Sequence, residues 1–327
     1  MEQATDPIRW GIAGTGSMAA SFVGDFANLS DGQIDAVASR SASSAETFAA
    51  ANDIGRAHGS YEALAADPHI DVVYVAGIHT VHADQAVMFL DAGKHVLVEK
   101  PMALNVAQVD SMIEAAARND RFLMEAMWMR FNPAHVAMMD RIEAGAIGDV
   151  RRIIADFSFA LPFDPEHRLY DRQKGGGALL DLGIYPVTLA WWVLGPPARI
   201  DVAGHVSETG VDDEITLLMS WDGGASAALT AGLRLPGTMA ARIEGTEGAI
   251  ELPLPAHCTD HMTIRSGLET EQITAEAAGH RHQVVEVHRC LRDGVRESAR
   301  MPLATSRAMI ERFDEIRAEL GVRYDVD

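Results

Sequence analysis

The sequence predicts an α/β protein of two domains, a parallel sheet covered on both faces followed by an α/β domain with an open, mostly antiparallel sheet. Short apolar strands alternate with helical patterns over the first third of the chain. A glycine-rich turn, Gly14-Thr15-Gly16, follows the first of these strands. After about residue 125 the rhythm changes to strands in which apolar and polar residues alternate. With 327 residues, the chain is long enough for two domains with separate cores.

The first third predicts one element after another in strict alternation. Apolar runs predict strands at 8–13, 34–39, 71–75, 95–98 and 122–125. Helical patterns lie between them at 18–27, 43–51, 81–92 and 106–118. Because the strands are apolar on both faces, they indicate a parallel sheet that is buried on both sides. We therefore expect the first domain to span residues 1–125.

The rest of the chain predicts a different kind of sheet. A long strand is expected at 150–160 and a helix at 178–193, after the run Gly175-Gly176-Gly177. Between 199 and 274, segments such as 215–220 and 225–233 alternate apolar and polar residues, which is typical of an antiparallel sheet with helices on one face. Closing helices are expected at 284–291 and 307–320. We expect the second domain to span residues 126–327.

Composition excludes several classes of partner. The net charge is −20, from 27 basic and 47 acidic residues, so nucleic acid and anionic membrane surfaces are poor partners. The two cysteines, Cys258 and Cys290, are too far apart to suggest a disulfide framework or a zinc ligand set. The N-terminus has acidic residues and no apolar segment, so we expect no signal peptide there, and no apolar run has membrane-spanning length. These features predict a soluble cytoplasmic protein.

The glycine-rich turn is the first candidate binding site. Gly14 to Ala19 fit the pattern G-x-G-x-x-[G/A] between a strand and a helix. The first glycine permits the tight turn, the second lets the backbone approach a pyrophosphate, and a small third residue lets helix and strand pack closely. Backbone amides at the helix start then face the phosphates. The residues expected to contact the dinucleotide in this turn are Gly14, Thr15, Gly16, Ser17 and Met18.

The end of the second strand bears on which dinucleotide is bound. Enzymes that prefer NAD usually carry Asp or Glu there for the ribose diol. This strand ends instead in Ser39-Arg40-Ser41. A guanidinium at Arg40 could pair with a 2′-phosphate, with the two serines as further donors. The simpler alternative is a solvated arginine at a strand end. We expect NADP rather than NAD.

Lys100 is the first candidate for catalysis. It follows the apolar strand 95–98 in the run Glu99-Lys100-Pro101, at the carboxyl edge of the sheet, where open α/β sheets bind ligands. The Lys-Pro step also favours a cis peptide bond that would aim the lysine into a cleft. The alternative is a surface lysine in a turn.

Asp181 and Tyr185 are the second catalytic candidates. They are four residues apart in the helix after the glycine run, so they share one face. A tyrosine hydroxyl can exchange a proton with a substrate hydroxyl, and a nearby ammonium favours its ionised form. Asp181 could hold the substrate or orient the lysine. The alternative is an ordinary amphipathic helix with a buried tyrosine.

These motifs, in this order, resemble the glucose-fructose oxidoreductase/inositol dehydrogenase/MocA family. The resemblance runs from 11–16 through 92–101 to the triple-glycine helix. Three further stretches, 124–133, 181–185 and 208–213, are similar to its branch of dimeric dihydrodiol dehydrogenases and NADP-dependent D-xylose dehydrogenases. The resemblance implies an N-terminal Rossmann domain and a C-terminal domain whose open sheet face forms a homodimer.

The resemblance also implies roles for particular residues. It makes Lys100, Asp181 and Tyr185 the catalytic group, with either Tyr185 or Lys100 as the proton carrier. The substrate pocket would be lined by side chains from both domains, namely His79, Trp128, Phe159, Asp181 and Tyr185. Further cofactor contacts would come from the lysine turn and its neighbours, namely His82, Glu99, Lys100, Pro101, Trp128 and Arg130.

The resulting expectation is an NADP-dependent dehydrogenase of a cyclic polyol, either an aldose such as D-xylose or D-glucose or a trans-dihydrodiol. One alternative is NADPH-dependent reduction of keto-sugars or dicarbonyls. The other, of a different class, is a non-catalytic NADP-sensing protein. His257, Cys258 and His261 could suggest a metal site, but Pro253 and Pro255 place them in an irregular stretch without a fourth ligand, so we expect no metal.

Overall fold

The computed structural model describes residues 6–26, 29–276 and 279–327. The chain divides into two compact units, one made of Met1–Trp128 with Ala278–Glu311 and the other of Met129–Ala277 with Arg312–Asp327. Helix α9 (Leu303–Leu320) therefore contributes its first half to one unit and its second half to the other.

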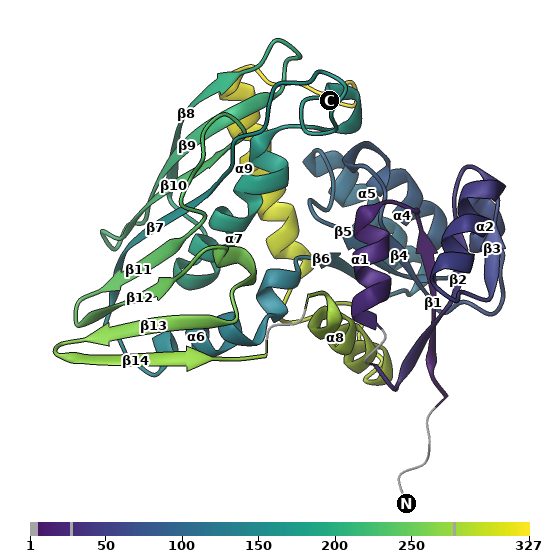
Figure 1. Cartoon of the computed structure of the whole chain (residues 1–327), viewed down its shortest axis with the longest axis horizontal. Helices are drawn as coiled ribbons and strands as arrows, with labels where there is room; N and C mark the ends of the chain where they lie inside the picture. Colours follow the sequence, from purple (N-terminus) through teal and green to yellow (C-terminus); the bar gives the residue numbers. More distant parts are fainter. Residues whose placement is uncertain (1–5, 27–28, 277–278) are drawn as a thin grey trace, which may run out of the picture. The chain divides into compact units, whose positions relative to one another are not determined.

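Unit 1 is built on a six-stranded sheet in the order β3-β2-β1-β4-β5-β6, with every pairing parallel (Figure 1). This is the Rossmann order, in which the chain reverses direction across the sheet between β1 and β4. The strands are β1 (Ile8–Ala13), β2 (Gly32–Ala38), β3 (Arg56–His58), β4 (Val72–Val75), β5 (His95–Glu99) and β6 (Leu123–Ala126).

The central strands are apolar because both of their faces are covered. All four residues of β4 are fully buried, as are Val96, Leu97 and Val98 of β5. The predicted continuous apolar runs and parallel sheet are confirmed. The helices of this unit are α1 (Ser17–Phe26), α2 (Ala42–Ala51), α3 (Tyr61–Ala65), α4 (His82–Asp91), α5 (Val106–Asn119) and α8 (Arg281–Arg292).

Unit 2 carries an eight-stranded sheet in the order β14-β13-β12-β11-β7-β10-β9-β8. Only the β7–β10 pair is parallel, so the predicted mostly antiparallel sheet is confirmed. The strands are β7 (Val150–Ser158), β8 (Arg199–Val206), β9 (Asp212–Ser220), β10 (Ser226–Gly232), β11 (Ala241–Gly245), β12 (Gly248–Leu252), β13 (His261–Ser266) and β14 (Glu269–Thr274).

One face of this sheet is covered and the other is exposed. Helices α6 (Pro133–Glu143) and α7 (Ile184–Leu194) lie on the same side of it (Figure 1). On β9, Leu217 is buried, whereas its neighbour Leu218 is 53% exposed. This alternation is typical of a sheet with one solvated face. A short π-helix, η4 (Leu179–Gly183), leads directly into α7, where the sequence predicts one continuous helix.

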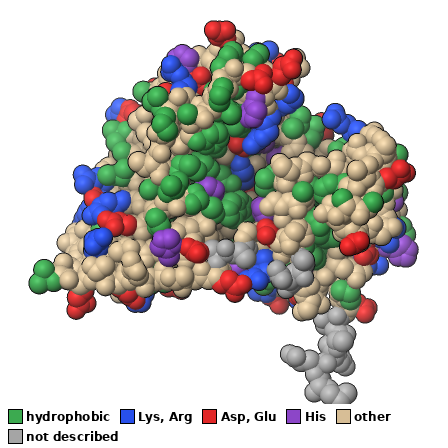
Figure 2. All heavy atoms as spheres, in the orientation of Figure 1, with side chains coloured by type: hydrophobic (Ala, Val, Ile, Leu, Met, Phe, Trp, Pro, Cys, Tyr) green, Lys and Arg blue, Asp and Glu red, His purple; other side chains and the backbone are tan. Residues whose placement is uncertain are grey.

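The segment Arg172–Leu194 is long and apolar enough to cross a membrane, but 83% of its most apolar window is buried inside the protein. It is therefore the core helix of unit 2. Figure 2 shows acidic and basic side chains interspersed over the face in view.

The compact units differ from the expected domain ranges 1–125 and 126–327 chiefly in the placement of α8 and of the first half of α9, both of which belong to unit 1. The residues of α8 pack with unit 1, because the His280 backbone N–H and side chain both contact Asp25 of α1, and the Trp10 indole N–H donates to His288 at 2.9 Å. The sequence analysis also did not predict β3, α3 or α6.

Candidate active site

The glycine-rich turn has the geometry that a dinucleotide site requires. Gly14 has φ +126°, and a Cβ there would lie 2.9 Å from the carbonyl oxygen of Ala76. A Cβ on Gly16 would meet no atom within 4 Å, so the space above this residue is open. Gly16 and Ser17 are exposed at the start of α1, Thr15 and Met18 are half-buried, and Ala19 is fully buried against the sheet. The turn therefore leaves room for a phosphate group beside the helix N-terminus.

Ser39, Arg40 and Ser41, the three residues expected to contact a 2′-phosphate, follow β2 and have different environments in the structure. Arg40 is exposed, and no ion pair to it occurs among the described residues. The Ser39 N–H donates to the His58 carbonyl at 3.2 Å. Ser41 is the N-cap of α2, and its hydroxyl accepts from the Ser44 N–H at 3.4 Å. A cap hydroxyl holds the helix start, so Arg40 is the group most available to an anion here.

Lys100 lies at the end of β5 and is 8% exposed. The predicted cis peptide bond between Lys100 and Pro101 is confirmed. The Lys100 N–H donates to the Glu99 carboxylate at 3.2 Å, and the Tyr74 hydroxyl donates to the same carboxylate. A buried lysine in a hydrogen-bonded turn is therefore present, and the alternative of a surface lysine is excluded.

A second buried carboxylate supports this turn from β6. Glu125 accepts the Met102 N–H at 2.8 Å and the Ser306 hydroxyl at 2.6 Å. Burial raises the pKa of Glu125 and the Glu99 charge adds to the rise, whereas the Lys100 charge opposes it. The ammonium of Lys100 thus lies in the electrostatic field of two buried carboxyl groups, those of Glu99 and Glu125. The sequence analysis did not predict a role for Glu125.

His82 is fully buried beside the same turn. Its Nδ1 lies 2.9 Å from the Pro101 carbonyl oxygen and its Nε2 lies 3.2 Å from the Gly77 carbonyl oxygen. Burial lowers the pKa of His82 to about 4, so the ring is neutral and has a single N–H. A neutral ring donates to one of these two carbonyl oxygens, and the contact to Pro101 is the shorter of the two. His79 is also buried, and the two imidazole rings are 5.7 Å apart.

Trp128 is half-buried at the end of unit 1. Its ring centroid is 5.4 Å from that of His280 at the start of α8. His280 is buried as well, with Nδ1 2.8 Å from Asp25. Helix α8 thus supports a residue expected to line the substrate pocket. Arg130, expected to contact the cofactor, belongs to unit 2 and stacks on the Trp192 ring at 4.8 Å.

Asp181 and Tyr185 lie in unit 2, in η4 and at the start of α7 respectively, and are 4% and 6% exposed. Arg168 binds Asp181 through both nitrogens of its fork, with Nη1 3.3 Å from Oδ1 and Nη2 3.1 Å from Oδ2. The π-helical turn that holds Asp181 is of a kind frequent at functional sites. The sequence analysis missed Arg168, since an isolated arginine in an irregular segment carries no pattern.

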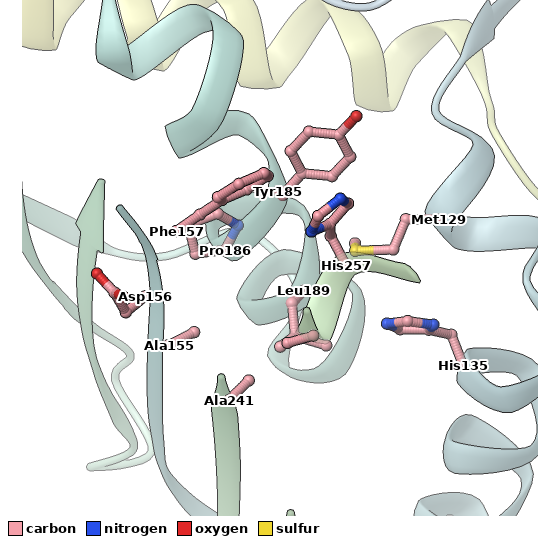
Figure 3. Close-up of a pocket in the computed structure, with 11 residues that line it drawn as sticks. Met129, His135, Ala155, Asp156, Phe157, Tyr185, Pro186, Leu189, Ala241 and His257 are labelled. Atoms are coloured by element: carbon pink, nitrogen blue, oxygen red, sulfur yellow. The ribbon is translucent and has the colours of Figure 1, made fainter. Parts of the chain in front are cut away.

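An aromatic cluster surrounds the Tyr185 ring (Figure 3). Phe157 of β7 stacks on His257 with centroids 4.3 Å apart, and both rings contact Tyr185, at 5.3 Å and 4.9 Å respectively. Phe159, expected in the substrate pocket, is 6.5 Å from Phe157. His257, considered in the sequence only as a metal ligand, thus contacts a predicted catalytic side chain. Among residues the structure describes, no group of acidic, His and Cys side chains could hold a metal ion.

A pocket lies behind this cluster, lined by Met129, His135, Ala155, Asp156, Phe157, Tyr185, Pro186, Leu189, Ala241, Ala256 and His257. The Tyr185 hydroxyl points away from Leu189 and Ala241 (Figure 3). His135 is fully buried here, and burial lowers the pKa of its imidazole to about 4, which favours the neutral ring.

Comparison with known proteins agrees with both units. Residues 8–127 match the model of an oxidoreductase family with an NAD-binding Rossmann fold, and residues 135–251 match the GFO/IDH/MocA C-terminal domain. The chain is 38% identical over 333 residues to trans-1,2-dihydrobenzene-1,2-diol dehydrogenase of Danio rerio, which covers 98% of this chain and 99% of the relative. The enzyme of the same name from Homo sapiens is 36% identical over 332 residues, with the same coverage.

Solved structures show the same fold. The aldose-aldose oxidoreductase of Caulobacter crescentus, complexed with glycerol, aligns with a TM-score of 0.87 at 24% identity, covering 97% of this chain and 98% of that one. KijD10, a 3-ketoreductase from Actinomadura kijaniata in complex with NADP and TDP-benzene, aligns with a TM-score of 0.85 at 25% identity, covering 96% and 98%.

The two sheets, the glycine turn at an NAD(P)-binding Rossmann domain and the full-length relatives confirm the resemblance seen in the sequence. The chain belongs to the GFO/IDH/MocA family of oxidoreductases and is an enzyme of the dehydrogenase type.

Proposed function

We propose that the protein oxidises a CH–OH group of a cyclic polyol, an aldose or a trans-dihydrodiol, with NADP as the acceptor. The observation that carries the proposal is Lys100, which is buried at the carboxyl end of β5 in the field of two carboxyl groups. Relatives that span nearly the whole chain are named as dehydrogenases of a dihydrodiol, which supports this substrate class.

The residues of unit 1 fit a dinucleotide. The amides of Gly16, Ser17 and Met18 would hold the pyrophosphate, since a side chain on Gly14 would collide with Ala76 and the space at Gly16 is open. Arg40 would pair with the 2′-phosphate, which favours NADP over NAD. When bound, the nicotinamide supplies the hydride acceptor.

The chain's own residues would manage the substrate proton. Tyr185 would take the proton from the substrate hydroxyl, with the Lys100 ammonium stabilising the resulting phenolate. Lys100 is the alternative base. Asp181 would hold a substrate hydroxyl or orient Lys100. His79, Trp128 and Phe159 would line the substrate pocket. Their aromatic rings would pack against the apolar face of a cyclic substrate.

The test is a spectrophotometric screen at 340 nm with NADP and then NAD over aldoses, inositols and dihydrodiols. We expect turnover with NADP, and a loss of roughly 100-fold or more in kcat for Tyr185→Phe with an unchanged dissociation constant for NADPH. Tyr61→Phe, on α3, is the matched control. Absence of turnover with every polyol, despite tight NADPH binding, would contradict the proposal and favour a cofactor-sensing protein.

The second candidate is the opposite direction, reduction of a keto-sugar or dicarbonyl by NADPH. It is favoured by the similarity to KijD10, which is named a 3-ketoreductase and was crystallised with NADP. The same residues would serve, with Tyr185 donating the proton. NADPH consumption with dicarbonyls but no NADP reduction with polyols would assign this direction.

We further propose a homodimer formed through the exposed face of the unit 2 sheet, in a cytoplasmic protein. Ile154 and Leu218 are 44% and 53% exposed, and uncovered apolar strand residues favour a partner surface. The double variant Ile154→Asp/Leu218→Asp is expected to be monomeric by light scattering if the wild type is a dimer. A monomeric wild type would contradict this part of the proposal.

A further inference from the structure

Asp181 is held by a side chain that no sequence motif indicated. Its carboxylate is 6% exposed, and the Arg168 guanidinium meets both oxygens, at 3.3 Å and 3.1 Å. A two-pronged contact between a guanidinium and a carboxylate fixes orientation as well as charge. Asp181 is therefore not a side chain that rotates freely toward substrate.

The glycine run before the helix brings Arg168 into place. The Gly177 N–H donates to the Leu169 carbonyl at 2.9 Å. A Cβ on Gly176 would lie 2.6 Å from the Leu169 carbonyl oxygen and 2.7 Å from that of Arg168. Only a residue without a side chain lets the 168–169 backbone lie against the start of the helix. The glycine run thus lets the helix start pack closely against the segment that carries Arg168.

Other titratable groups surround the same turn. The Tyr324 hydroxyl donates to the Gly176 carbonyl oxygen at 2.5 Å. Burial raises the pKa of Tyr324, and the charges of Asp212 and Asp181 add to the rise. Asp212 of β9 accepts the Leu179 N–H at 2.5 Å, and burial raises its pKa to about 7. Arg168 contacts Asp181 directly and carries the positive charge of the ion pair.

We propose that Arg168 is a positioning residue for the reaction, which keeps the Asp181 carboxylate ionised and oriented one helical turn before Tyr185. This inference rests on the proposed function of Asp181 and Tyr185. Without Arg168, the buried Asp181 carboxylate would bind a proton more readily and would be held less firmly in its rotamer. A protonated Asp181 could no longer orient an ammonium or accept from a substrate hydroxyl in the same way.

Three variants separate the effect of Arg168 on the charge of Asp181 from its effect on the orientation of Asp181. Arg168→Gln removes the charge, and Arg168→Lys restores the charge without the two-pronged geometry. Arg172→Gln is the matched control, because Arg172 is a similarly exposed arginine of the same unit whose partner is Asp325, at 3.1 Å. kcat and KM for the polyol that turns over best would be measured from about pH 5 to about pH 9, together with NADPH affinity.

We expect Arg168→Gln to lose about 10-fold or more in kcat at the acidic end of this pH range, with part of the loss recovered toward the alkaline end. NADPH affinity should stay unchanged. Arg168→Lys should restore the wild-type pH profile while kcat stays below the wild-type value. In an Asp181→Asn background, Arg168→Gln should have little further effect, because the two residues act as a unit.

Two results would overturn the inference: an unchanged pH profile in Arg168→Gln, or an equal loss in the Asp181→Asn background. If the wild type turns over no polyol, the proposed function fails and the pair is tested without activity. A carbon-13 titration of the Asp181 carboxyl then compares wild type with Arg168→Gln. A higher titration midpoint in the variant supports control of the Asp181 charge by Arg168, and identical midpoints contradict it.

Discussion

The Nδ1 atom of His82 lies 2.9 Å from the carbonyl oxygen of Pro101, so a fully buried imidazole joins the start of α4 to the lysine turn after β5. The ring has one N–H to donate, because burial lowers its pKa to about 4. His82 thus holds the backbone beside Lys100, which is a more specific role than the cofactor contact expected from the sequence.

His82→Ala should reduce the free energy of unfolding by roughly 2–4 kcal/mol, since it leaves a cavity and an unpaired carbonyl group. His82→Asn, whose amide N–H can replace the Nδ1 donor, should lose less. Urea unfolding of both variants measures the difference. Equal losses in the two would show that ring volume, and not the hydrogen bond to Pro101, is what matters.

The contribution of His82 to stability should decrease as the pH falls. The folded-state pKa of His82 is lowered from 6.5 to about 4, so its contribution to stability is present above pH 6.5 and is lost as the pH falls toward 4. The loss amounts to roughly 3 kcal/mol. His82→Asn, which does not titrate, should therefore narrow its stability deficit relative to wild type on acidification. A deficit that is constant with pH would contradict this.

Gly14 and Gly16 should respond differently to the same substitution. Gly14→Ala places a side chain 2.9 Å from the Ala76 oxygen at φ +126°, so it should lower the thermal midpoint. Gly16→Ala meets no atom within 4 Å, so it should fold normally. It should nevertheless weaken NADPH binding by about 10-fold or more, measured by fluorescence, because its methyl group occupies the space proposed for the pyrophosphate. Unchanged affinity in Gly16→Ala would place the cofactor elsewhere.

Much of the fold could be predicted because its signal is local. The central strands β4 and β5 are buried on both faces and appear in the sequence as continuous apolar runs, and β1 has the predicted bounds. The short strand β3 (Arg56–His58) has no such run and was missed. Helix α6 did carry a signal, since Asn132 caps it and Pro133 occupies its first turn.

The candidate site was harder to predict, because its parts depend on tertiary structure. Arg168 reaches Asp181 from an irregular segment 13 residues earlier in the chain. His257 reaches Tyr185 and Phe157 from a single 3-10 turn, Ala256–Cys258, after β12, and a turn this short has no periodicity to predict it. Sequence motifs identified residues on regular elements, whereas the side chains that support them come from segments without a pattern.

Arg40→Gln should change the preference for the dinucleotide. Loss of a charged hydrogen-bonding partner for the 2′-phosphate is expected to lower kcat/KM with NADP by about 10- to 100-fold and to leave NAD almost unaffected. Arg118→Gln, which removes a surface arginine paired with Asp91, is the control. Steady-state kinetics with both cofactors measure the ratio. An equal effect on NADP and NAD would assign Arg40 a role other than phosphate recognition.

Asp212 should make the stability of unit 2 fall as the pH rises. It is fully buried against Gly177, and burial raises its pKa from 3.8 to about 7. Since the folded state binds this proton more tightly than the unfolded state, the contribution is present below pH 4 and is lost as the pH rises through 7.

Asp212→Asn removes this titration while keeping an oxygen that can accept the Leu179 N–H. Between pH 5 and pH 8, the free energy of unfolding of the variant should rise relative to wild type by roughly 3 kcal/mol. This corresponds to the two pH units between pH 5 and the folded-state pKa of about 7. Thermal or urea unfolding at both pH values, monitored by a probe in unit 2, measures this gain. A gap between variant and wild type that does not change with pH would show that the wild-type carboxyl has the same proton affinity in the folded and unfolded states. Asp212 would then act on the helix start through its hydrogen bond to Leu179 alone.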